Sequence, residues 1–145
     1  MSLQPQVVVN ADHRQKCRLF IAALRSYGRA SLCVTGTSML PALWPGDVVE
    51  VRTATIPEVN VNDIVAFSRD ERIFVHRVLR QDLVAGVPVL ITRGDALAYD
   101  DPAVNCAELL GLARVTERVP RTVLSWIRKA VQFRLLPPVL ERLRS

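Results

Sequence analysis

The sequence predicts a mainly β domain, a small barrel or folded sheet, with one helix before it and one after it. Between residues 31 and 119, short runs of apolar and β-branched residues are separated by turns rich in Gly, Pro and Asp. Such punctuation is typical of small β domains. The flanking segments, 1–30 and 120–145, each contain a run with helical spacing of apolar residues instead. With 145 residues, half of them apolar, the chain is long enough for one domain with a core.

The elements can be placed in chain order. Residues 1–11 show no clear pattern, and a helix is expected from Asp12, which can cap it, to Tyr27, where Gly28 ends it. A later helix is expected over residues 121–136, where two consecutive prolines break it. Between the helices we expect five or six strands, two of them forming a hairpin with residues 69–71 at its tip. Their expected ranges are 32–35, 48–52, 64–68, 73–79, 87–92 and 109–117.

The formal charge of +5 is concentrated near the C-terminus, where arginines far outnumber acidic residues. Residues 121–145 are therefore expected either to contact an anionic membrane peripherally or to form a helix that packs on the sheet or faces solvent. No run of about 18 apolar residues and no secretory signal is apparent, so a cytoplasmic location is expected.

The three cysteines are widely spaced, without a CxxC pair or zinc-binding spacing. We expect Cys17, Cys33 and Cys106 to be small buried residues in a reducing compartment. With only two histidines, the chain suggests no metal or organic cofactor.

One segment has the residues of a nucleophile turn. Gly36 can bend the backbone sharply after a strand, so that the Ser38 hydroxyl projects from the strand end. Backbone N–H groups near Ser38 would then be placed to stabilise an oxyanion. Met39 and Pro41 follow, and a Gly-Asp pair comes at 46–47. Taken alone, a Gly-x-Ser turn is more often structural than catalytic.

The whole pattern, however, resembles the nucleophile segment of the signal peptidase I and SOS-repressor peptidases, the S24/S26 clan. This resemblance implies that Ser38 is the nucleophile and that Met39 supports it. Most of these enzymes use a lysine as base, but Lys16 precedes the serine and Lys129 lies in the last helix. At the expected place stands His76 in Phe-Val-His-Arg-Val, which resembles the archaeal and endoplasmic-reticulum branch, in which a histidine is the base.

A histidine base usually needs an acidic partner to fix its tautomer. The resemblance implies that Asp101 orients His76 and that Asp95 braces the loop, although Asp100 could exchange roles with Asp101. The chain departs from its apparent relatives at residues 96–97, which are Ala and Leu where polar residues are usual. It also has Gly36 where a serine often assists the oxyanion hole, and it lacks a spanning helix.

The resulting expectation is a serine endopeptidase that cleaves an extended peptide after small residues. Within the same fold, the alternatives are a non-catalytic peptide-binding or maturation module and a regulator similar to the SOS repressors. A nucleic-acid-binding β barrel is disfavoured because only 6% of the residues are aromatic. The expected partner is therefore a peptide or protein substrate.

Overall fold

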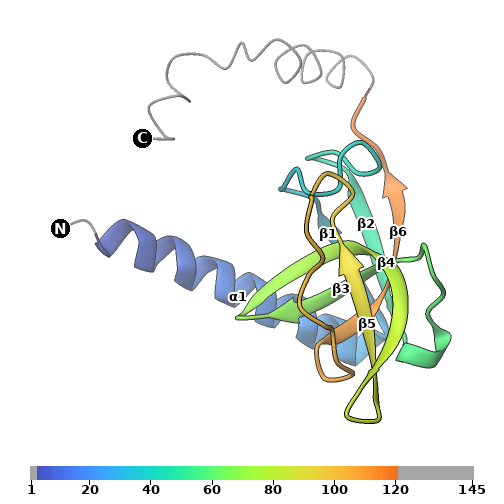
Figure 1. The fold of residues 1–145 in the computed structure, drawn as a ribbon. Coiled ribbons are helices and arrows are strands. Elements are labelled where there is room, and N and C mark those ends of the chain that lie inside the picture. The colour runs from blue at the N-terminus through green and yellow to red at the C-terminus, as the bar shows by residue number, and fades with distance from the viewer. Residues whose placement is uncertain (1–2, 121–145) are drawn as a thin grey trace.

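The protein is mainly β, as the sequence predicts. The computed structural model describes residues 3–120, with backbone alone over residues 3–12. Within them, six antiparallel strands form one sheet in the order β1-β2-β6-β3-β4-β5, with helix α1 beside β1 (Figure 1). The predicted C-terminal helix, and the membrane contact expected of residues 121–145, lie outside the described residues. The elements are α1 (Leu3–Tyr27), β1 (Arg29–Cys33), β2 (Val48–Thr53), η1 (Ile56–Glu58), β3 (Ile64–Arg69), β4 (Arg72–Val84), β5 (Val87–Arg93) and β6 (Leu109–Glu117).

Helix α1 begins earlier than predicted. It starts at Leu3, so the expectation that it begins at Asp12 is wrong. Pro5 does not prevent this early start, because proline is tolerated in the first turn of a helix, where the N–H groups have no intrahelical acceptor. The C-terminus is as predicted: Gly28 has a φ of 73° and donates its N–H to the carbonyl of Leu24 at 2.8 Å.

Two strands differ from their expected bounds. The first occupies Arg29–Cys33 instead of 32–35, because the turn at Gly28 leads directly from α1 into β1. The long strand β4 continues past residue 79 to Val84, because its two halves have different partners. Its first half pairs with β3, and its second half, from Arg77, pairs with β5. Strand β6 has its predicted bounds.

The core consists of three apolar clusters. The largest lies around Phe67, Val78 and Leu90, and a second joins Leu24 of α1 to Val51 and Ala66 of the sheet. The third contains Met39, Leu43 and Val49 and lies beneath the loop between β1 and β2. This third cluster fixes that loop to the sheet, which matters for the site described below.

The cysteine prediction holds only for Cys17. Cys17 is buried, whereas Cys33 and Cys106 are exposed. Cys33 lies on the edge strand β1, and Cys106 lies in the turn before β6, so neither is covered by a second layer.

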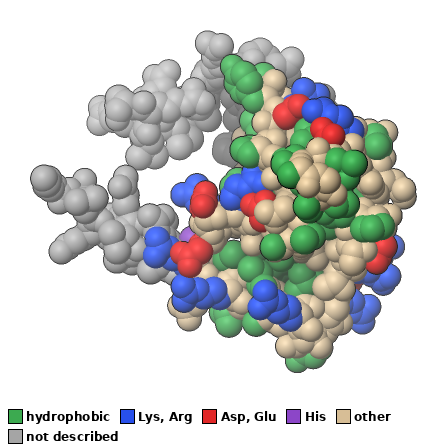
Figure 2. Space-filling view, turned by 60° about the horizontal axis from the view of Figure 1, so that its bottom comes forward, with side chains coloured by type: hydrophobic (Ala, Val, Ile, Leu, Met, Phe, Trp, Pro, Cys, Tyr) green, Lys and Arg blue, Asp and Glu red, His purple; other side chains and the backbone are tan. Residues whose placement is uncertain are grey.

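The surface carries apolar side chains among charged ones (Figure 2). Leu83, Val84 and Val87, all more than half exposed, form the end of the β4–β5 hairpin. No helix within residues 3–120 has the length and apolar character needed to cross a bilayer.

Candidate active site

Ser38 lies in the loop that joins β1 to β2. The base of the loop is closed by two backbone hydrogen bonds, from Val34 N–H to the Asp47 carbonyl and from Gly46 N–H to the Val34 carbonyl, both 2.8 Å long. Inside the loop, Leu43 N–H donates to the Met39 carbonyl at 2.9 Å. Since the side chains of Met39 and Leu43 are buried in the core, Ser38 is held between two anchored turns.

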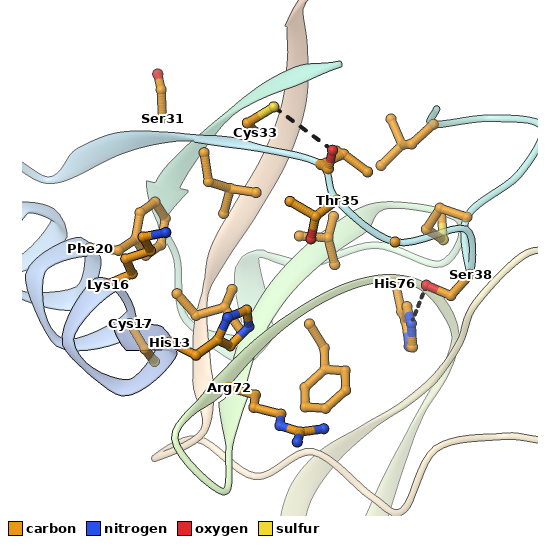
Figure 3. A pocket seen from close by; sticks show the side chains of 18 residues that line it. His13, Lys16, Cys17, Phe20, Ser31, Cys33, Thr35, Ser38, Arg72 and His76 are labelled. Carbon is orange, nitrogen blue, oxygen red and sulfur yellow. Dashed lines mark hydrogen bonds between the residues drawn. The ribbon is translucent and has the colours of Figure 1, made fainter. Parts of the chain in front are cut away.

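His76 approaches Ser38 from the middle of β4. Its Nε2 lies 3.1 Å from Ser38 Oγ, within hydrogen-bond distance (Figure 3). The ring is only 4% exposed and lies against Phe67 and Phe74, with ring centroids 5.9 and 6.0 Å from it. The histidine therefore meets the serine in a largely apolar setting, on a strand that is paired on its β3 side.

Asp101 contacts the other nitrogen of His76. Its Oδ2 lies 2.6 Å from Nδ1, and the same oxygen accepts a hydrogen bond from Thr92 Oγ1 at 2.7 Å. Burial raises the pKa of Asp101, but the hydrogen bonds from His76 and Thr92 outweigh burial and hold this pKa below its ordinary value. An ionised carboxylate can only accept, so the proton must be on Nδ1, which leaves Nε2 free to accept from Ser38.

The two neighbouring aspartates have other partners. Asp100 faces Arg80 and Arg93, each 3.7 Å away, on the outer side of the loop. Asp95 accepts two hydrogen bonds of 2.8 Å from Arg77, the residue that follows the histidine. These bonds, foremost among the causes, hold the pKa of Asp95 below its ordinary value. Of the three aspartates that the sequence offers as partners of His76, Asp101 is the one in contact with the imidazole.

The loop that carries Asp95 packs directly on the β1–β2 loop that carries Ser38. Ala96 N–H donates to the carbonyl of Ser38 at 2.9 Å, and Asp95 N–H donates to Met39 Sδ at 3.4 Å. Gly94 lies so close that a Cβ built on it would be 2.6 Å from the Ser38 carbonyl oxygen. At residue 96 it is the backbone N–H that makes the contact.

Backbone donors are also available at the serine. Within residues 3–120, the N–H of Ser38 donates to no backbone carbonyl. Because position 36 is glycine, no hydroxyl is offered there, and the Ser38 N–H is one donor that could stabilise an oxyanion.

A cavity of about 700 Å³ begins at Ser38 and His76 and extends toward α1. Its walls are residues 31–36 of β1 and the following loop, residues 72–76 of β4, and one face of α1 (Figure 3). Its middle is apolar, with Phe20, Leu32 and Phe74 among the lining residues. The cavity can therefore hold an extended chain whose reactive carbonyl reaches Ser38.

Three residues at the site were not identified from the sequence. Thr92 holds Asp101, Arg77 holds Asp95, and the buried Asp47 accepts hydrogen bonds from the N–H groups of Trp44 and Val119, both 2.9 Å long. Asp47 belongs to the Gly-Asp pair of the motif, which is the one sequence signal among the three. Arg77 belongs to the Phe-Val-His-Arg-Val segment, but nothing there indicated its contact with Asp95, and Thr92 lies on a strand with no local signal. No cluster of three or more His, Cys, Asp or Glu suited to a metal ion occurs in the described part of the chain.

No protein-family model matches the chain, and no match is found among curated proteins. Any conclusion about function must therefore be argued from this site.

Proposed function

We propose that the protein is a serine endopeptidase similar to signal peptidase I, with Ser38 as nucleophile and His76 as general base. The observation that carries this proposal is the unbroken chain of contacts from Ser38 Oγ through both ring nitrogens of His76 to Asp101. Each group is within hydrogen-bond distance of the next, which is the relation expected of a nucleophile, its base and the group that orients the base.

The reaction follows from the protonation states at the site. Nε2 of His76 accepts the hydroxyl proton while Ser38 Oγ attacks the substrate carbonyl, and Asp101 stabilises the imidazolium that forms. Backbone N–H groups at Ser38 and its neighbours stabilise the tetrahedral oxyanion. His76 then gives its proton to the leaving amine as the peptide bond breaks, and water hydrolyses the acyl-enzyme by the same steps.

The strand pairing supports an extended substrate. Among residues 3–120, strand β1 pairs only with β2, at the edge of the sheet, and residues 72–76 of β4 pair only with β3. Both segments line the cavity, so a peptide lying there can form backbone hydrogen bonds in the manner of an added strand. A preference for small residues at the cleaved bond is implied by the family resemblance.

The test is mass-spectrometric mapping of cleavage in a library of extended peptides that contain Ala-x-Ala segments. Wild type is compared with Ser38→Ala and His76→Ala, and Ser26→Ala, an exposed serine of α1, is the matched control. We expect cleavage by wild type and the control and at least a thousandfold loss in the other two variants.

Cleavage that persists in Ser38→Ala would contradict the proposed nucleophile. If folded wild type cleaves nothing, with or without anionic vesicles, the non-catalytic peptide-binding module becomes the better explanation.

A further inference from the structure

The cavity has different chemistry at its two ends. One end is the Ser38–His76 pair, and the far end is lined by the basic residues His13, Lys16 and Arg72 (Figure 3). Among the described residues that line the cavity, none is acidic. The cavity therefore presents a positive potential at one place, well away from the reactive serine.

The acidic residue that precedes Arg72 in the chain, Glu71, is engaged by α1. Its carboxylate contacts Arg14 and Arg18 at 2.8 and 3.0 Å. Arg72 makes no ion pair with any residue of the described part of the chain. Its guanidinium group can therefore bind an anionic group at the cavity.

The distance between the two ends can be expressed in residues of substrate. Arg72 and His76 lie four positions apart on β4, which corresponds to about 14 Å along an extended strand. A substrate strand beside β4 would cover this distance with about four of its own residues. The apolar lining between them, including Ile73, Phe74 and Val75, suits uncharged side chains.

We infer that the substrate is an extended peptide with an acidic side chain about four residues from the bond that is cut, bound by Arg72 at the α1 end of the cavity. The inference rests on the proposed function for the position of that bond. It adds a charge requirement that a preference for small residues at the cleaved bond does not contain.

Binding is measured first, because it does not depend on catalysis. Fluorescent Ala-x-Ala peptides carry Glu, Gln or Lys four residues before the expected bond in one series and four residues after it in another. They are titrated against folded Ser38→Ala protein by fluorescence anisotropy at low salt. In one of the two series we expect Glu peptides to bind about fivefold more tightly than Gln peptides, and Lys peptides to bind more weakly than either. This preference should shrink at 0.5 M salt, because exposed charges are then screened, with a Debye length of roughly 4 Å.

Charge reversal identifies the residue responsible. Arg72→Glu, combined with Ser38→Ala, should remove or reverse the preference for Glu peptides. Arg25→Glu makes the same change of charge on α1 but outside the cavity lining, so it should keep the preference. Equal binding of Glu, Gln and Lys peptides, an equal effect of both reversals, or no binding by folded protein would overturn the inference.

The cleavage assay separates this inference from the proposed function. If wild type cleaves Glu, Gln and Lys peptides at the same rate, the endopeptidase proposal stands and the charge requirement fails. If Glu peptides bind preferentially but none is cleaved, the charge requirement stands for a peptide-binding site, and the proposed catalysis fails.

Discussion

Ser38 and His76 are 38 residues apart in sequence, yet their reactive atoms are held at 3.1 Å without any direct covalent constraint. The imidazole can be positioned because its other nitrogen is bound. Asp101 Oδ2 receives two short contacts, from His76 and from Thr92, so the carboxylate cannot rotate without losing both. The position of the base therefore depends on a threonine that has no direct contact with the serine.

We predict that Asp101→Asn lowers kcat by about a thousandfold to ten-thousandfold, because an amide neither enforces the Nδ1–H tautomer nor stabilises the imidazolium. Since the pKa of Asp101 lies below its ordinary value, the wild-type carboxylate is charged throughout the neutral range, so the deficit of the variant should be similar across neutral pH. The measurement is steady-state cleavage of the best library peptide.

Thr92→Val keeps the shape of the side chain and removes one hydrogen bond, so we expect a smaller loss in kcat, about tenfold. Thr116→Val on β6 is the matched control, since its hydroxyl donates to the Val48 carbonyl, away from His76 and Asp101. Full activity in Asp101→Asn, or equal losses in the two threonine variants, would contradict this account.

At the scale of single residues, the sequence predicts that Ser38 and His76 lie together, but it does not predict all of their neighbours. Asp100 and Asp101 are adjacent and chemically identical, and only the path of the folded loop places one against His76 and the other against arginines. Thr92 is an ordinary strand residue until the loop after β5 brings Asp101 back to it. No local pattern encodes such a contact.

Two loops from distant parts of the chain form the site. The β1–β2 loop carries Ser38, and the loop after β5 carries Asp95 and Asp101. They meet through the Ala96 N–H and the Ser38 carbonyl. Their close approach is possible because residue 94 has no side chain.

We predict that Gly94→Ala reduces kcat at least tenfold. The added methyl group would lie 2.6 Å from the Ser38 carbonyl oxygen, so it must displace the β1–β2 loop that carries Ser38. The overall fold should persist, with a loss of about 1–3 kcal/mol in the free energy of unfolding. Peptide cleavage and urea unfolding measure the two effects. Wild-type kcat in Gly94→Ala would show that the loop contact does not position the serine.

Elements with regular alternation were predictable, and elements fixed by tertiary contacts were not. Strands β2, β3, β5 and β6 lie within a residue of their expected ends, because turn residues bound each of them. The early start of α1 was missed because residues 1–11 carry no strong pattern. The shift of β1 was missed because the turn at Gly28 leads directly from α1 into this strand. The second half of β4 was missed because its pairing with β5 is what extends it. The cavity was also not predictable, because it forms only where α1, β1 and β4 meet.

In the whole molecule, the β1–β2 loop that carries Ser38 is hydrogen-bonded to the far end of the described chain. The carboxylate of Asp47 is buried and accepts N–H bonds from Trp44 in the loop and from Val119 beyond β6, both 2.9 Å long. Arg118 adds a hydrogen bond to the Ala42 carbonyl at 3.1 Å. Trp44 and Val119, 75 positions apart, thus share one carboxylate, so the loop and the exit from β6 should lose their order together.

We predict that Asp47→Ala destabilises the protein by about 2–3 kcal/mol, because two N–H groups in a buried setting lose their acceptor. It should also lower kcat, because the loop that holds Ser38 then loses the carboxylate that joins it to the exit from β6. Asp47→Asn keeps one acceptor and should fall between wild type and Asp47→Ala in stability.

Asp63→Ala is the matched control: Asp63 also accepts a backbone N–H, from Asn60, but in an exposed turn away from the site. Urea unfolding and peptide cleavage are measured on all four proteins. If Asp47→Ala lost stability but kept full kcat, the link to β6 would serve folding alone, whereas joint loss would show that the serine depends on an anchor beyond the last strand.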